Sequence, residues 1–182
     1  MHGHAPLPPV FGIGHSTHTL EAFVALLQAN AIDCVVDVRR LPGSRRFPQF
    51  DGPALAASLQ PLGIDYLHLV PLGGRRGRSL PTGTSPNGFW QNASFRRYAD
   101  YAMGEDFHAG FAQLLELSSA RRCTLMCAEV LWWRCHRRII IDYLLAAGRT
   151  ACHIDGNGRA EPARMTPAAT REGDHLVYPP DP

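Results

Sequence analysis

Short apolar runs alternate with longer amphipathic segments along the chain, and this alternation constrains the fold more than any other feature. The runs at 10–14, 33–38, 64–70, 123–127 and 150–154 have the length and composition of buried strands. The segments between them show helical spacing of apolar residues. Strands that alternate with helices form a parallel sheet, because each crossover helix returns the chain to the same end. The sequence therefore predicts an α/β fold, with a mostly parallel sheet of about five strands and helices on both faces in a Rossmann-like three-layer arrangement.

The expected helices cover about 20–30, 51–62, 95–119 and 134–147. In the first, apolar residues at 20, 23, 24 and 27 share one helical face, and Thr17 or Thr19 is the expected N-cap. The third breaks near Gly104, and Asp106 is the expected cap of its second piece.

The length of 182 residues suits one domain. A TIM barrel is excluded, because eight strand–helix repeats need about 250 residues. We expect a flexible N-terminal arm at 1–9, the α/β domain at 10–155, and a C-terminal tail at 156–182 that is partly disordered or packed on the surface.

Charge and composition narrow the class of protein. The net charge of +2 excludes a general polyanion binder, so any contact with nucleic acid needs a local patch. The sequence contains no apolar run of the length that spans a membrane, and its start lacks the features of a signal peptide. We therefore expect a cytoplasmic protein that has no membrane partner. The five cysteines favour free thiols or metal ligands over a disulfide framework.

All 18 basic residues are arginine, and twelve of them form Arg-Arg pairs. Coding bias is one explanation for the absence of lysine, and the alternative is anion recognition, because guanidinium groups bind phosphate and carboxylate through paired hydrogen bonds. Four pairs follow predicted strands, at 39–40, 45–46, 75–76 and 137–138.

Polar and reactive residues follow the predicted strands. In an open parallel sheet, ligands bind beyond the carboxyl ends of the strands, where these residues would meet. The catalytic candidates are Cys127, Glu129, Asp37 and His15. The candidates for anion binding are Ser16, Arg39, Ser44, Arg45, Arg75, Arg134, His136 and Arg137. The sequence therefore predicts an arginine-rich cleft at this edge of the sheet.

Several of these stretches resemble the bacterial and archaeal family known as domain of unknown function 488 (DUF488). The matching stretches include 12–18, 36–39, 48–50, 72–74, 98–101 and 126–137, so the resemblance runs from about residue 11 to 155. It implies an α/β fold and a shared site, without a named reaction. The family often has a histidine near its C-terminal end, whereas the corresponding stretch here, 157–162, has none.

Cys127 has the surroundings expected of a reactive thiol. It ends a predicted strand and precedes a helix, with Arg134 and Arg137 close in sequence, and both helix N-termini and guanidinium groups stabilise a thiolate. Cysteine phosphatases have a related arrangement, but their loop is one residue shorter than 127–134, and this loop has no glycine to form a phosphate cradle. The alternative is an inert, buried cysteine.

Three hypotheses about function remain. The first is an enzyme that holds an anionic substrate in the arginine-rich cleft and uses Cys127 or Glu129 chemically. The second is a non-catalytic module for nucleic acid or a nucleotide, which uses the same arginines and the glycine-rich loop at 71–94. The third is a metal-binding protein whose ligands are Cys127, Cys135 and His15. Asp37 and Glu129 could instead form ion pairs, Asp37 with Arg39 or Arg137 and Glu129 with Arg134. The sequence indicates no particular cofactor.

Overall fold

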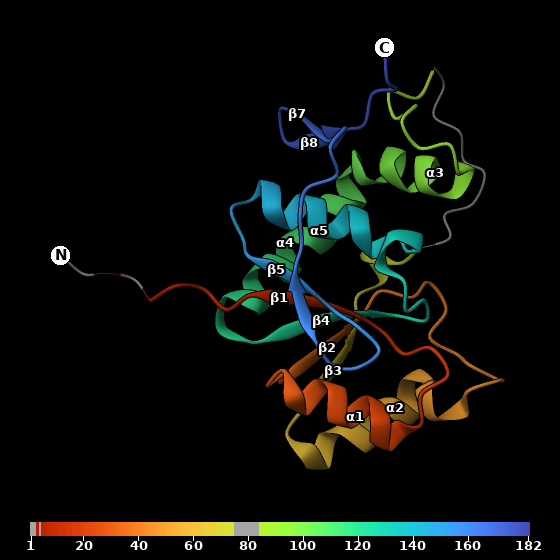
Figure 1. Ribbon diagram of the computed structural model, residues 1–182, viewed down its shortest axis with the longest axis vertical. Helices are drawn as coiled ribbons and strands as arrows, with labels where there is room; N and C mark the ends of the chain where they lie inside the picture. The colour runs from red at the N-terminus through yellow and green to blue at the C-terminus, as the bar shows by residue number, and fades with distance from the viewer. Residues whose placement is uncertain (1–2, 4, 75–83) are drawn as a thin grey trace.

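A six-stranded sheet forms the centre of the molecule (Figure 1). The computed structural model describes residues 3, 5–74 and 84–182. The strands are β1 (Val10–Gly14), β2 (Cys34–Asp37), β3 (Asp65–His68), β4 (Cys123–Cys127), β5 (Ala151–Ile154) and β6 (Ala160–Pro162), in the order β3-β2-β4-β1-β5-β6. Neighbouring strands among β1 to β5 are parallel, and β6 is antiparallel to β5. The predicted mostly parallel α/β sheet is confirmed.

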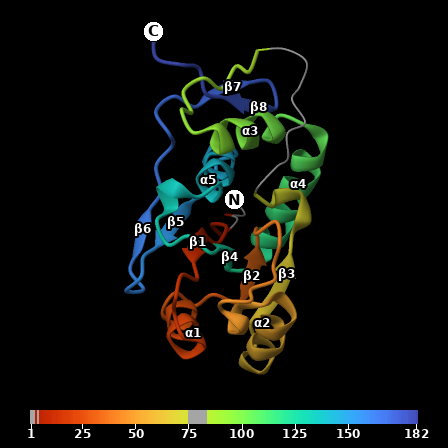
Figure 2. The same ribbon diagram turned by 90° about the vertical axis from the view of Figure 1, so that its right-hand side faces the viewer.

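Helices cover both faces of this sheet (Figure 2). On one side lie α1 (Leu20–Ala29) and α2 (Gly52–Leu59), and on the other lie α3 (Ala93–Ala102), α4 (Glu105–Ala120) and α5 (Arg137–Ala146). Short 3₁₀ turns occur at η1 (Pro48–Phe50), η2 (Gln60–Leu62), η3 (Val70–Leu72) and η4 (Trp132–Arg134). No helix in the described ranges has the length and apolarity needed to cross a membrane.

The central strands are buried on both faces, which explains why they read as unbroken apolar runs. All five residues of β1 are buried, and so are all five of β4. Side chains alternate between the two faces of the sheet. Phe11 and Met126 therefore pack into the core beneath α1 and α2, whereas Val10 and Leu125 pack into the core beneath α4 and α5.

Two helix starts differ from the sequence prediction. Gly104, not Asp106, is the N-cap of α4, and Asp106 lies in the first turn, where its carboxylate is favoured by the helix dipole. The helix predicted from about 134 begins at Arg137, because the turn η4 and an extended Cys135 precede it. Thr19 is the N-cap of α1, as expected, and its side chain accepts a hydrogen bond from the Ala22 backbone N–H.

The segment after Asp155 adds structure that the sequence analysis does not anticipate. It supplies β6 and a hairpin of β7 (Thr170–Glu172) and β8 (His175–Val177). Tyr178, directly after this hairpin, is fully buried. Its backbone N–H donates to Asn87 Oδ1, and its hydroxyl donates to Asp142 Oδ2. The segment is therefore packed into the domain at Tyr178.

The connections place a topological switch point between β1 and β4. These neighbouring strands pair in parallel, but β1 continues into α1 on one face and β4 into α5 on the other. Because the two crossovers leave in opposite directions, a crevice opens between the carboxyl ends of the two strands.

Candidate functional site

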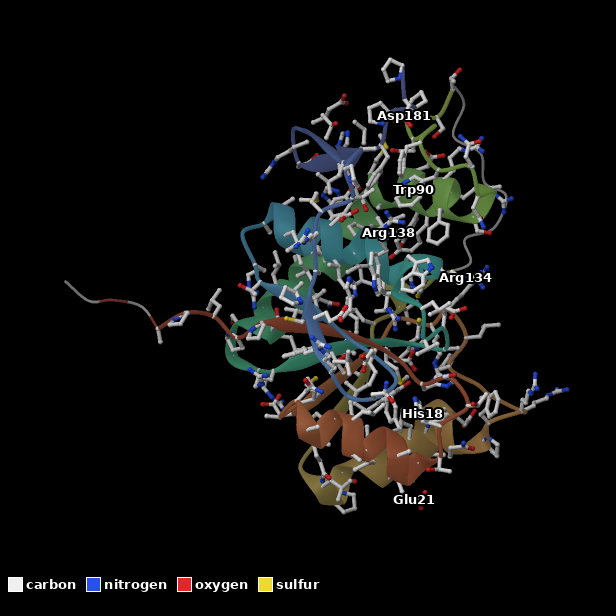
Figure 3. All side chains as sticks on the ribbon, viewed as in Figure 1. His18, Glu21, Trp90, Arg134, Arg138 and Asp181 are labelled. Carbon is white, nitrogen blue, oxygen red and sulfur yellow. The ribbon has the colours of Figure 1, made fainter. Side chains whose placement is uncertain are left out.

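A cavity of about 860 Å³ lies at this switch point. Its lining comes from the loops that follow β1, β2 and β4, from Gly74 after η3, and from the start of α3. The candidates that line it are His15, Ser16, Arg39, Ser44, Cys127, Glu129, Arg134, Cys135 and His136. Figure 3 shows Arg134 on the side of the molecule where these loops gather. The structure therefore brings together residues from three separate strand ends.

Gly14 allows the loop after β4 to lie across the end of β1. Gly14 is paired with Cys127 in the sheet register, and the next backbone N–H groups, of His15 and Ser16, donate to the carbonyls of Cys127 and Ala128 at 2.9 and 3.0 Å. A Cβ atom on Gly14 would lie 2.1 Å from the Glu129 carbonyl oxygen. Glycine is thus required for the close approach that positions Cys127 at the cavity.

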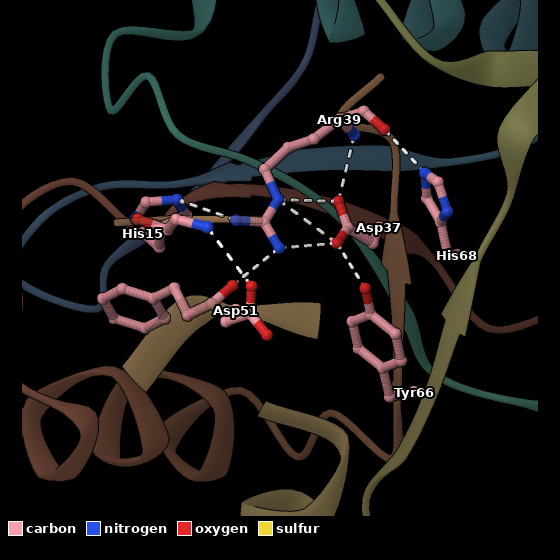
Figure 4. A network of polar contacts seen from close by, with 8 residues as sticks. His15, Asp37, Arg39, Asp51, Tyr66 and His68 are labelled. Atoms are coloured by element: carbon pink, nitrogen blue, oxygen red, sulfur yellow. Dashed lines mark hydrogen bonds and ion pairs between the residues drawn. The ribbon is translucent and has the colours of Figure 1, made fainter. Parts of the chain in front are cut away.

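A buried polar network forms the floor of the cleft beside β2 (Figure 4). Asp37 accepts hydrogen bonds from the backbone N–H, Nε and Nη2 of Arg39, and a further one from the Tyr66 hydroxyl. Asp37 is fully buried and does not line the cavity. The ion pair of Asp37 with Arg39, one of the two expected alternatives, is present at 2.7 Å. Asp37 therefore holds Arg39 in place and has no access to a ligand.

His15 is fixed by the same network. A carbonyl can only accept, so the Nδ1–H of His15 donates to the Ser16 carbonyl at 2.9 Å, and Nε2 accepts from Arg39 Nη1 at 3.4 Å. The ring also stacks on Phe50, with centroids 4.3 Å apart. Burial lowers the pKa of His15, which keeps the ring neutral. Both ring nitrogens are already engaged.

Cys127 and Cys135 form a close thiol pair in the cavity wall. Their Sγ atoms lie 2.7 Å apart, and the side chains are 4% and 5% exposed. The hydrogen bond from Cys135 and the positive charge of Arg137 outweigh burial and lower the pKa of Cys127 to about 7. Burial and the neighbouring Cys127 raise the pKa of Cys135. Cys127 is therefore the sulfur of the pair that ionises first near neutral pH, and Cys135 keeps its proton.

His136 lies behind Cys135. Its Nε2–H donates to the Val38 carbonyl at 2.7 Å, so its Nδ1 carries the lone pair and faces Cys135 Sγ at 3.6 Å. A Cβ atom on Gly74 would lie 2.6 Å from this Nδ1, so glycine at that position makes room for the ring. The Cys135 thiol thus has a proton acceptor beside it.

Arg137 is buried beneath the cavity and does not line it. It is 1% exposed, and its Nη2 donates to the Val130 carbonyl at 3.1 Å. Its Nε and Nη1 have no hydrogen-bond partner within the part of the chain that the structure describes. The expected alternative partner Asp37 is occupied by Arg39. Arg137 therefore supplies a buried positive charge that favours the Cys127 thiolate, and it does not contact the cleft itself.

The charges that line the cavity are mostly positive. Arg39, Arg40 and Arg134 contribute guanidinium groups, and Glu129 is the one carboxylate among the described lining residues. Glu129 Oε1 accepts from the Leu131 backbone N–H. The Arg134 side chain is exposed, and it makes no ion pair with Glu129 or with another described residue. The Arg134 guanidinium is therefore available to contact an anion in the cavity.

The predicted anion ligand Arg45 is not brought to this cavity, since it is exposed and lies outside the lining. The predicted ligand Arg75 falls outside the described residues. Sequence reasoning missed a wall formed by Asn92, Phe95 and Tyr98 at the start of α3. The signal for this wall was the N-cap pattern of α3, where Asn92 Oδ1 accepts from the Ser94 backbone N–H. No group of three or more His, Cys, Asp or Glu suited to a metal ion occurs in the described ranges.

The fold and the site together define an open parallel α/β protein whose switch-point cleft holds a cysteine pair and an excess of arginine. The family model described as "Domain of unknown function DUF488" matches residues 19–144, more than half of the chain. The chain belongs to this family. Neither a curated protein nor a solved structure matches it.

Proposed function

We propose that the cleft binds an anionic small molecule and that Cys127 attacks an electrophilic atom of it, which makes the protein a cysteine-dependent enzyme. The observation that carries the proposal is the place of Cys127, which lines the cavity at the end of β4 with a lowered pKa, with three arginines around the same cavity. A thiolate is the reactive form of cysteine. The volume of about 860 Å³ lies in the range of small-molecule sites, which supports this ligand over a nucleic acid strand.

Separate roles follow for the charged side chains. Arg134 is exposed at the cavity, so it is the side chain proposed to contact the anionic group. Arg39 is held by Asp37, so it positions His15 and adds positive charge. Glu129 is the carboxylate proposed to transfer a proton to or from the ligand, because it lines the cavity next to Cys127.

Alkylation tests this proposal with two reagents of nearly equal size. Iodoacetate is an anion and iodoacetamide is neutral, and peptide mapping separates Cys127 from the other cysteines. We expect the alkylation rate of Cys127 to rise with pH around a midpoint near 7. We also expect a higher ratio of iodoacetate to iodoacetamide rates than a free thiol shows, and a reduction of that ratio by phosphate.

Two arginine variants provide the contrast. Arg134→Gln should lower the iodoacetate rate several-fold and leave the iodoacetamide rate nearly unchanged. Arg45→Gln is the matched control, because Arg45 is exposed outside the cavity. A midpoint near 8.5, the value of free cysteine, or the same rate ratio as a free thiol would refute the proposal.

A further inference from the structure

We propose that Cys127 and Cys135 are a redox-active dithiol that reduces a small hydroperoxide and closes to an intramolecular disulfide. This inference rests on the reactive Cys127 thiolate of the proposed function, but it requires no anionic substrate. It gives chemical roles to Cys135 and His136, which take no part in the attack of Cys127 on an anionic substrate.

The geometry of the thiol pair is the first support. The Sγ atoms of Cys127 and Cys135 are in direct contact at 2.7 Å, so formation of a disulfide needs only a small closing movement. The contact depends on the turn η4, which folds the loop back so that Cys135 meets the end of β4. Both thiols line the same cavity, so an oxidant that enters it reaches the pair.

The charges around the pair assign the two sulfurs different roles. Arg137 lies near Cys127, and its buried guanidinium keeps Nε and Nη1 without a partner among the described residues. When Cys127 is ionised, its thiolate supplies a negative charge close to this buried guanidinium group. Cys135 instead faces the Nδ1 lone pair of His136 at 3.6 Å. Cys127 is therefore the attacking sulfur, and Cys135 is the resolving sulfur.

The reaction balances in two steps. The Cys127 thiolate attacks one oxygen of the hydroperoxide, so that an S–O bond forms, the O–O bond breaks, and the leaving alkoxide or hydroxide takes up a proton from the solvent. Sulfur supplies the two electrons, and Cys127 becomes a sulfenic acid. The Cys135 thiol then gives its proton to His136 Nδ1, and its sulfur attacks the Cys127 sulfur. The S–S bond forms as the S–O bond breaks, and the leaving hydroxide takes the proton from His136 as water.

Burial decides which oxidants can take part. Cys127 and Cys135 are 4% and 5% exposed, so a disulfide on another protein cannot reach them, whereas hydrogen peroxide or a small alkyl hydroperoxide fits the cavity. The disulfide returns to two thiols by exchange with two equivalents of an external thiol. In the oxidised state Cys127 is no longer a nucleophile, so oxidation also stops the proposed attack on an anionic substrate.

The chain contains its own control pair. Cys34 and Cys123 lie opposite each other in β2 and β4, and their thiols also interact, but both are buried in the core away from the cavity. Two adjacent thiols alone would predict oxidation of both pairs. We instead expect oxidation of Cys127 and Cys135 only, because this pair is reached through the cavity and has Arg137 and His136 beside it.

The experiment treats the reduced full-length protein with increasing hydrogen peroxide, blocks remaining thiols with N-ethylmaleimide, and maps the peptides by mass spectrometry. We expect a disulfide between Cys127 and Cys135, loss of Cys127 alkylation, and recovery with dithiothreitol. Cys34 and Cys123 should stay reduced at the same peroxide concentration. A disulfide at that pair instead, or direct conversion of wild-type Cys127 to sulfinic acid, would overturn the inference.

Two variants separate the two steps. Cys135→Ser should leave Cys127 as a sulfenic acid that a dimedone probe captures. His136→Asn should also accumulate this sulfenic acid, with disulfide formation slowed by about 10²-fold, the usual size of a proton-transfer contribution. Dimedone capture at no cysteine in either variant would contradict the assigned roles. If the wild-type protein prefers iodoacetate but forms no disulfide, the redox inference fails and the proposed anion site stands. If it forms the disulfide but shows no preference for iodoacetate, the proposed anion site fails and the redox inference stands.

Discussion

Gly14→Ala is the change whose effect follows most directly from the structure. The new Cβ atom would lie 2.1 Å from the Glu129 carbonyl oxygen, 2.4 Å from its carbonyl carbon and 2.6 Å from Val130 Cα. Ordinary contacts of this kind are about 3.5 Å, so the loop after β4 must move by about 1 Å or more. All three atoms belong to the backbone, so rotation of a side chain cannot relieve the overlap.

The magnitude follows from what the movement breaks. The hydrogen bonds from the His15 and Ser16 N–H groups to the loop contribute about 1 kcal/mol each, and overpacking adds about 1–3 kcal/mol. The free energy of unfolding should therefore fall by about 3–5 kcal/mol. For a chain of this size, that corresponds to a decrease in Tm on the order of 10 °C. The pKa of Cys127 should rise toward that of free cysteine, because the same movement separates it from Cys135.

Thermal unfolding followed by circular dichroism measures the first effect, and the pH midpoint of Cys127 alkylation measures the second. Gly156→Ala is the matched control, because the nearest atom to its new Cβ would be Val130 Cγ2 at 3.9 Å. This control should stay within about 0.5 kcal/mol of wild type. A Gly14→Ala variant that unfolds like wild type with an unchanged alkylation midpoint would refute the argument for close approach.

Three further predictions concern buried polar groups. Arg137→Met should raise the alkylation midpoint of Cys127, because it removes the buried charge that favours the thiolate, and should lower the free energy of unfolding by about 1–3 kcal/mol, because the Val130 carbonyl loses its donor. Burial lowers the pKa of His153 from 6.5 to about 4, so the unfolded chain binds a proton that the folded protein rejects between these values. Stability should therefore fall by about 3 kcal/mol as the pH drops through this window, and urea titrations of His153→Asn should show a weaker pH dependence. Tyr178→Phe removes the hydrogen bond to Asp142 Oδ2 and should cost about 1–3 kcal/mol in urea unfolding.

Each of these has an outcome that contradicts it. An unchanged alkylation midpoint in Arg137→Met would mean that the guanidinium does not favour the Cys127 thiolate. An equal pH dependence in wild type and His153→Asn would assign the acid sensitivity to other groups. Wild-type stability in Tyr178→Phe would show that Asp142 is satisfied without the hydroxyl.

The sheet was predictable because β1 and β4 are buried on both faces, so their apolar residues form unbroken runs in the sequence. The strand β6 was not predictable in the same way. Its three residues are half-buried or exposed, and they form an edge strand, so no apolar run marks it. Tyr178 is held in the core by its hydrogen bond to Asn87, which lies 91 residues earlier in the sequence. The spacing of apolar residues within a segment cannot predict such a long-range contact.

The edge of the sheet that carries the candidate site was also predictable, since parallel strands end at one edge. The sequence did not predict that Arg134 and Arg137 differ in exposure. One is exposed at the cavity and the other is buried, and the difference depends on where η4 ends and α5 begins. The contact of Cys127 with Cys135 has the same origin, because only the folded turn brings positions eight residues apart together.

The buried Tyr178 has a consequence for the order in which the molecule assembles during translation. Its ring packs on Trp90, which stacks on Phe95 in the cavity wall, and its carbonyl accepts from the Phe89 backbone N–H. The ribosome produces Tyr178 91 residues after Asn87, the residue that binds its N–H. We therefore expect the start of α3 to pack into place only after Tyr178 has left the ribosome. Until then, a nascent chain that already contains Cys127 and Cys135 has an open cleft.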